Sequence, residues 1–183
     1  MPVVLHKFRD HQVNPKTEIL MLGTFNPDVE DGPDFFHGRQ RNFLWHLLPI
    51  CWGFESLKEA SLADKQAFMA THKIDFADII HSLDIPEGED GNVDDAFEDT
   101  HVHEWKDIIA LIDTLPNLKA VYFTRKTFNG ITNMRGQVVA IAKHCQQKGI
   151  RMCKLETPAK FFSEEKQKQW IDTIVLQKTC LRP

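Results

Sequence analysis

Short apolar runs alternate with amphipathic segments along this chain, and no other feature of the sequence restricts the fold as strongly. Apolar runs at 18–23, 118–123 and 150–155, with a further candidate at 74–80, have the length and composition of buried strands. Helical spacing of apolar residues predicts helices over 41–51, 62–72, 103–115, 127–148 and 163–178. This order predicts an α/β fold, a three-layer α/β/α sandwich around a short, mostly parallel sheet.

The chain size fits a single domain over residues 1–183, with 42% hydrophobic residues to build its core. No apolar run approaches the ~18 residues of a membrane span, and the charged first ten residues do not read as a signal peptide. The four cysteines lack the C-x-x-C spacing of zinc ribbons, so we expect reduced thiols. The expectation is a cytoplasmic protein without a metal or other cofactor.

The charge of the chain is unevenly distributed. The net charge is −4, but segment 84–99 holds eight carboxylates and no Lys or Arg, which leaves +4 for the rest of the chain. We expect this acidic segment to be a solvated loop. The remainder is mildly basic, so a nucleic-acid partner is neither demanded nor excluded by charge.

Candidate site residues are expected beyond the carboxyl ends of the strands, where ligands bind in parallel α/β sheets. The segments at that edge are 24–40, 81–99, 124–127 and 156–162. In the first of them, Gly23 allows the chain to turn sharply off the strand and Pro27 fixes its exit. Asn26 is thereby placed at the edge of the sheet, with an amide that can donate and accept hydrogen bonds.

Aromatic and basic residues follow this turn. Phe35 and Phe36 precede Arg39 and Arg41 at the start of the helix predicted over 41–51. Aromatic faces stack on nucleobases, and guanidinium groups bind phosphate. The combination favours a nucleic-acid ligand.

These motifs resemble the uracil-DNA glycosylase superfamily. A strand that ends at Gly23 and is followed by Thr24-Phe25-Asn26-Pro27 is similar to the first motif of the mismatch-specific branch. Phe35 through Trp45 resembles the aromatic, basic, Asn, Trp run that follows it. The segments 75–80 and 155–170 resemble the central segment, second motif and closing helix of the hypoxanthine-DNA glycosylase branch. The resemblance runs from about residue 18 to residue 170 and implies the fold expected above.

The resemblance implies roles for particular residues. By position, Asn26 matches the residue that orients the hydrolytic water, Phe36 the ring that stacks on the flipped base, and Asn42 an Asn implicated in the hypoxanthine branch. Thr157 and Pro158 match the segment that presses into DNA. Where the family often has Asn after the strand at 118–123, this chain has Thr124.

The chemistry of the residues adds further candidates. Breaking a base–sugar bond requires a water held against an oxocarbenium-like sugar and donors for the departing base. The turn at Thr24 and Phe25 could donate its backbone N–H groups, and Asp78 at a strand end could act as general base or bind a base N–H. Phe161 is a candidate wedge that fills the gap left in the DNA stack. Cations expected at the rim of the site are Arg39, Arg41, Arg125, Lys126 and Lys160.

Several of these residues also have purely structural interpretations. Phe36 could pack under the first loop, and Asn26 could be an Asn-Pro turn former. Asn42 could cap a helix, and Asp78 could be a cap or a salt-bridge partner. The pair Phe161 and Phe162 could form a hydrophobic staple before Ser163.

The leading functional hypothesis is a monofunctional DNA glycosylase that removes a deaminated or mismatched base, uracil or hypoxanthine, from DNA containing the damaged base. It is expected to act as a monomer without a membrane partner. The alternative is a non-catalytic or divergent member of the fold that binds a nucleotide, a modified base or a protein; the acidic segment and Thr124 favour it. A small-molecule hydrolase finds no support, because the chain lacks a Gly-x-Ser-x-Gly elbow and a Walker lysine.

Overall fold

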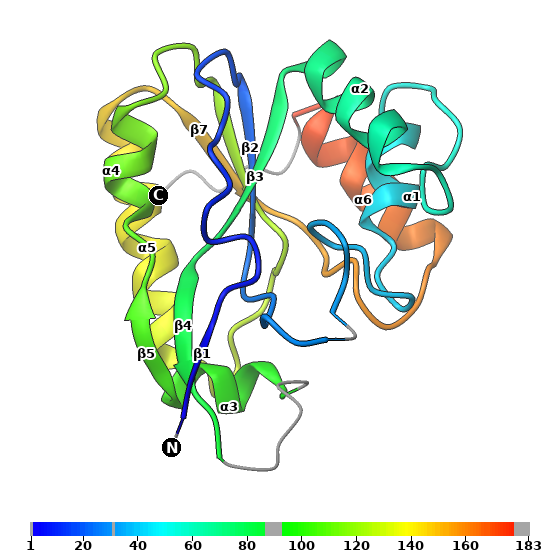
Figure 1. Ribbon diagram of the computed structural model, residues 1–183. Helices are drawn as coiled ribbons and strands as arrows, with labels where there is room; N and C mark the ends of the chain where they lie inside the picture. The colour runs from blue at the N-terminus through cyan, green and yellow to red at the C-terminus, as the bar shows by residue number, and fades with distance from the viewer. Residues whose placement is uncertain (1, 31, 87–92, 178–183) are drawn as a thin grey trace.

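A four-stranded parallel sheet forms the centre of the protein (Figure 1). The computed structural model describes residues 2–30, 32–86 and 93–177. The strand order is β3-β2-β6-β7, built from Ile74–Asp78, Ile19–Gly23, Ala120–Phe123 and Arg151–Lys154. Both faces of this sheet are covered by helices, so the predicted α/β/α sandwich is confirmed.

The two covering layers follow from the alternation of side chains along the strands. On one face, Leu20, Leu22 and Val121 pack under α4 (Ile108–Asp113) and α5 (Thr132–Gln147). On the other, Met21 and Tyr122 pack under three further helices. These are α1 (Leu44–Ile50), α2 (Leu62–His72) and α6 (Glu164–Ile174). The two central strands, β2 and β6, are buried on both faces, which explains their continuous apolar runs.

A second, antiparallel sheet extends the fold and was not predicted from the sequence. Its order is β1-β4-β5, from Val3–Leu5, Ile80–Asp84 and Val102–Trp105. Only Ile79 separates β3 from β4, so the chain passes directly from the parallel sheet into the antiparallel one. The carboxyl end of β3 is consequently the junction of the two sheets.

Two predicted elements are corrected by the structure. The helix expected over 103–115 begins only at Ile108, because the preceding segment pairs with β4 and the Asp107 side chain caps α4 by accepting from the Ala110 N–H. The acidic segment expected as a solvated loop contains the helix α3 (Asp95–Thr100), capped by Asp94. Within that segment, residues 87–92 lie outside the described residues.

The acidic residues at the end of that segment have specific structural partners. Asp99 is buried and accepts hydrogen bonds from the backbone N–H groups of Asn133 and Met134, in the first turn of α5. The Ile131 side chain at the start of α5 provides no cap of its own. A carboxylate from α3 therefore caps a distant helix, which fixes α3 against the body of the protein.

Cysteine oxidation differs from the expectation at one position. Cys51 and Cys145 are buried free thiols, whereas Cys153 on β7 is disulfide-bonded. The expectation of reduced thiols was therefore wrong for Cys153.

Gly136 offers a test of the local helix energetics. It is exposed within α5, and a Cβ built there meets nothing within 4 Å. Gly136→Ala is expected to raise the free energy of unfolding by about 1 kcal/mol, because alanine loses less backbone entropy on entering a helix. Urea denaturation measures the change, and a fall in stability would contradict this description of α5.

Candidate active site

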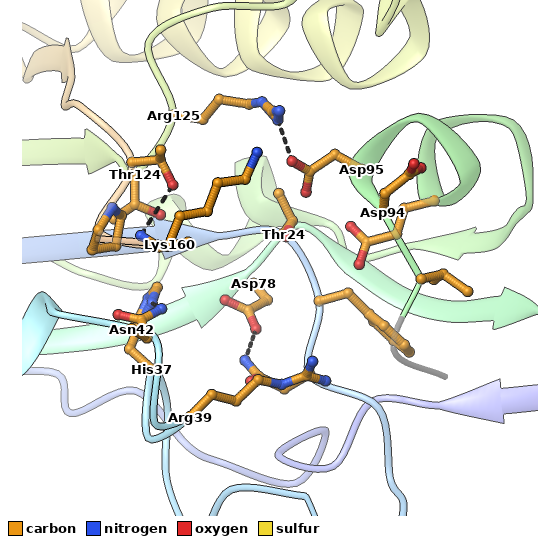
Figure 2. A pocket seen from close by; sticks show the side chains of 17 residues that line it. Thr24, His37, Arg39, Asn42, Asp78, Asp94, Asp95, Thr124, Arg125 and Lys160 are labelled. Atoms are coloured by element: carbon orange, nitrogen blue, oxygen red, sulfur yellow. Dashed lines mark hydrogen bonds and ion pairs between the residues drawn. The ribbon is translucent and has the colours of Figure 1, made fainter. Parts of the chain in front are cut away.

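A cavity of about 350 Å³ opens at the carboxyl edge of the parallel sheet (Figure 2). The ends of β2, β3 and β6 form its floor, and α3 and the loop at 157–160 form its walls. Its volume is in the range of small-molecule sites and accommodates one nucleobase. Seventeen residues line it: Thr24, Phe25, Asn26, His37, Arg39, Asn42, Asp78, Val93, Asp94, Asp95, Glu98, Thr124, Arg125, Thr157, Pro158, Ala159 and Lys160.

Asp78 is the most constrained group in this cavity. Its side chain is buried, and its Oδ2 accepts hydrogen bonds from Asn26 Nδ2 at 2.5 Å and from His6 Nε2 at 2.7 Å. Its other oxygen, Oδ1, is buried without a hydrogen-bond partner. Figure 2 shows Asp78 between Arg39 and Lys160, which lie on opposite sides of it. The carboxylate is thus held at one oxygen, and its other oxygen has no hydrogen-bond partner.

His6 orients this carboxylate and was missed by the sequence analysis. Its Nδ1 accepts from the Phe8 N–H at 3.0 Å, so the ring proton lies on Nε2 and is donated to Asp78. The residue directly follows β1, which pairs with β4. No motif indicated it, because its proximity to Asp78 depends on the pairing of strands that are distant in sequence.

The environment of Asp78 favours its ionised form. Burial raises the pKa of Asp78, but this effect is outweighed by the hydrogen bond from His6, the electrostatic influence of His6 and His37, and the amide of Asn26. The net result is a pKa below its usual value. The side chain can therefore accept a proton at neutral pH.

Gly23 leaves the space that Asp78 occupies. The two residues are paired in register across β2 and β3, and a Cβ at position 23 would lie 2.3 Å from Asp78 Oδ1. No side chain larger than hydrogen fits there without displacing the carboxylate. The glycine that ends β2 thus has a role beyond turning the chain.

His37 and Asn42 form a neighbouring polar pair. The Asn42 amide donates to His37 Nδ1 at 3.2 Å, and Asn42 Oδ1 accepts from the Leu44 N–H at 3.0 Å. Asn42 therefore binds the first backbone N–H of α1 from the position before the N-cap, which is Phe43, and also lines the cavity. His37 Nε2 is buried without a partner, and burial lowers the pKa of His37 despite the nearby Asp78. A neutral imidazole with an unused N–H results.

A second carboxyl group, Glu98 on α3, lines the cavity and was not singled out from the sequence. Burial and the carboxylates of Asp95 and Asp78 raise the pKa of Glu98 well above its usual value, against the opposing effects of Thr24 and Arg39. Its Oε2 is buried without a hydrogen-bond partner. The cavity thus contains one carboxyl group whose pKa is lowered and another whose pKa is raised.

Most of the residues predicted for the site meet in this cavity. The set of predicted residues that line it comprises Thr24, Phe25, Asn26, Arg39, Asn42, Asp78, Thr124, Arg125, Thr157, Pro158 and Lys160. Four predicted residues do not line it: Phe36, Arg41, Lys126 and Phe161. The hydroxyl of Thr124 donates to the carbonyl of Leu22 at 3.0 Å, so its proton is already used within the sheet.

Phe36 does not have the position that base stacking requires. Its ring is 1% exposed, stacks on Phe76 with centroids 5.9 Å apart, and contacts Phe8 at 4.7 Å. It belongs to the core beneath the first loop, in agreement with its structural interpretation. Phe25 is the aromatic residue that lines the cavity. Phe36 therefore does not face the cavity, although the resemblance matched it to the ring that stacks on the flipped base.

The cations around the opening differ in their partners. Arg125 forms an ion pair with Asp95 at 2.5 Å, and Lys126 forms one with Glu156 at 2.9 Å. Arg41 is exposed outside the cavity, and its carbonyl accepts from the Lys160 N–H at 2.9 Å. This bond and an isolated bridge between Asn42 and Ala159 join two segments that the sequence assigned to DNA binding.

Phe161 protrudes from the protein next to the opening. Its side chain is 61% exposed, with the Lys166 ammonium 4.4 Å from its ring centroid. Phe162, in contrast, packs against Phe43 and His46. The two adjacent rings therefore separate into one surface ring and one packed ring.

Two kinds of feature are absent from the described residues, a metal-binding cluster and a membrane-spanning helix. Over residues 2–30, 32–86 and 93–177, no group of three or more His, Cys, Asp or Glu side chains is arranged to hold a metal ion. In the same part of the chain, no helix has the length and hydropathy needed to cross a membrane.

Comparisons with known proteins agree with the fold of the protein. No family model matches the sequence. A hypoxanthine DNA glycosylase from Methanosarcina barkeri is 28% identical over 114 residues, 62% of this chain and 67% of the relative. The solution structure of a candidate uracil DNA glycosylase from Methanosarcina acetivorans superimposes with a TM-score of 0.58 at 18% identity, covering 93% of this chain and 92% of the other. The chain is thus similar in sequence to a named DNA glycosylase, and the structural comparison confirms the expected α/β fold.

Proposed function

We propose that the protein is a monofunctional DNA glycosylase that hydrolyses the N-glycosidic bond of uracil or hypoxanthine flipped out of DNA. The observation that carries this proposal is the buried Asp78 carboxylate in the lining of a cavity of nucleobase size, with a lowered pKa and one oxygen that has no hydrogen-bond partner. The named hypoxanthine DNA glycosylase relative supports the same class of activity.

The reaction follows from the positions of two oxygens. Asn26 donates through its amide nitrogen to Asp78, which leaves its carbonyl Oδ1 as an acceptor. A water that donates to this oxygen and to Asp78 Oδ1 is held for attack at C1′ of the sugar. The C1′–N bond breaks with its electron pair going to the base, the water oxygen bonds to C1′, and Asp78 takes the water proton.

Base flipping is assigned to the rim of the cavity. Extruding a base costs a few kcal/mol, which phosphate contacts and stacking must offset. Arg39, Arg41 and Lys160 supply positive charge near the opening, and Phe25 supplies a ring inside it. The exposed Phe161 ring replaces the lost base in the stack.

The test compares wild-type protein with Asn26→Ala on oligonucleotides that carry one deoxyuridine or one deoxyinosine. Abasic sites are cleaved with alkali and the products are counted under single-turnover conditions. Asn26→Ala is expected to lower the rate roughly 100-fold, because one of the two oxygens that hold the water is lost.

The control for that test is Asn117→Ala. Asn117 is exposed, and its side chain contacts only the Pro15 carbonyl. This variant is expected to retain the wild-type rate. The proposed function is contradicted if wild-type protein produces abasic sites with neither lesion, or if Asn26→Ala retains the wild-type rate.

A second candidate, binding of a nucleotide or modified base without hydrolysis, is favoured by one observation. Arg125 and Lys126 are paired with carboxylates, which reduces the charge available for phosphate. Salt dependence separates the two candidates. A glycosylase that contacts several phosphates loses affinity for DNA steeply with salt, whereas absence of DNA binding at low salt supports the second candidate.

A further inference from the structure

Glu98 is fixed in the wall of the cavity by contacts on both sides of it along the chain. Asp94 caps the helix that carries it, and Asp99 binds the first turn of α5. Glu98 itself is only 6% exposed, and its Oε2 has no hydrogen-bond partner. Burying a polar atom without a partner is costly, so a ligand that completes its hydrogen bonding is the simplest reason for its presence.

We propose that Glu98 is a base-contacting residue that selects the substrate: its Oε2 donates a hydrogen bond to a carbonyl oxygen of the flipped base. This inference rests on the proposed function, and it assigns a role to a residue that neither the motifs nor the named relatives indicate. Oε2 is the oxygen of this carboxyl group that is buried without a hydrogen-bond partner. A neutral carboxyl group that carries its proton on this oxygen can donate it to an acceptor.

The chemistry of deamination explains why such a donor is selective. Deamination replaces an exocyclic amino group, a donor, by a carbonyl oxygen, an acceptor. Uracil therefore differs from cytosine, and hypoxanthine from adenine, at the group that Glu98 meets. A hydrogen-bond donor in the cavity wall therefore binds the carbonyl oxygen of the deaminated base. If the normal base entered, its amino group would face this donor, and a buried donor would be left without an acceptor.

Burial and the charges that face Glu98 favour its protonated form. Asp95 on its own helix and Asp78 on β3 both raise its pKa, in addition to burial. Thr24 on the turn after β2 and Arg39 on the first loop act in the opposite direction and are outweighed. Asp94 also lines the cavity. The hydrogen bond from Glu98 to the base carbonyl becomes stronger as negative charge develops on the leaving base.

Two substitutions of Glu98 distinguish a role as hydrogen-bond donor to the base from a purely structural role. Glu98→Gln keeps the shape and a neutral N–H donor, whereas Glu98→Met keeps the length and removes all hydrogen bonding. We expect the single-turnover rate to fall roughly 100-fold in Glu98→Met and to stay within about tenfold of wild type in Glu98→Gln. Glu104→Gln, exposed on β5 outside the cavity, is the matched control and should retain the wild-type rate.

Two further measurements exclude an effect on folding. The wild-type rate should fall as pH rises through the raised pKa of Glu98, because the donor proton is lost, and this decline should be absent in Glu98→Gln. The melting temperature of Glu98→Met should equal or exceed that of wild type, because an unpaired buried polar atom is removed. A residue kept only for stability would give a lower melting temperature.

The outcomes distinguish this inference from the proposed function. If wild-type protein releases no base, the proposed function fails and the role of Glu98 falls with it. If wild-type protein releases base and Glu98→Met matches its rate, only the role of Glu98 is overturned. A Glu98→Gln rate as low as that of Glu98→Met, or an unchanged decline with pH, also overturns it.

Discussion

Asp78→Asn is expected to lower the single-turnover rate of base release roughly 10³–10⁴-fold, the upper part of the range for a general base. The amide cannot accept the proton of the attacking water. Its NH₂ group also takes the place of one of the two carboxylate oxygens, either Oδ2, where it faces the donors His6 and Asn26, or Oδ1. The rate is measured on the deoxyuridine and deoxyinosine oligonucleotides, at a temperature where circular dichroism shows the variant folded. Asp10→Asn, an exposed carboxylate outside the cavity, is the control.

The pH dependence of the wild-type protein follows from the direction of the Asp78 shift. Because its folded-state pKa is below the usual value, the carboxylate is ionised over the neutral range and contributes stability above its unfolded pKa. That contribution is lost as pH falls through the folded pKa. Asp78→Asn should therefore be less stable than wild type at pH 7, and this difference should diminish in strong acid.

For the activity of the same variant, a rate of base release within tenfold of wild type at pH 7 would remove Asp78 from the mechanism.

Gly23→Ala is expected to abolish base release by displacing Asp78. The added Cβ would clash with Asp78 Oδ1 and lie 3.3 Å from His37 Cε1, so the buried carboxylate must shift. Overpacking of this kind costs about 1–3 kcal/mol of folding free energy. Activity and urea denaturation are measured together.

Gly136→Ala serves as the control for Gly23→Ala, because the same methyl group is added where nothing lies within 4 Å. It should be fully active and slightly more stable than wild type. Full activity in Gly23→Ala would show that the position of Asp78 Oδ1 is not critical.

The elements that the sequence specified best are those with local signals. The run before Gly23 forms β2, and the helix predicted over 62–72 has these same limits in the structure, because Ser61 caps it through its hydroxyl. The sheet formed by β1, β4 and β5 could not be predicted in this way. Its strands are short and only partly apolar, and their pairing depends on residues up to about 80 positions apart.

The site was predicted at the correct edge of the sheet, but not in its detail. Asn26 and Asp78 were found because they follow strands whose carboxyl ends meet. His6 and Glu98 were missed, since one lies in an unpredicted strand region and the other in a segment interpreted as a solvated loop. Local sequence also does not determine which ring faces the cavity, so Phe36 was assigned where Phe25 lies.

The most direct test of the account is the structure of Asp78→Asn bound to DNA that contains deoxyinosine or deoxyuridine. We predict the lesion base inside the cavity, with its sugar C1′ facing Asn26 and residue 78 and its carbonyl oxygen at Glu98. Phe36 should remain in the core. A lesion base that stays in the duplex, or that binds away from Asn26 and residue 78, would contradict the account.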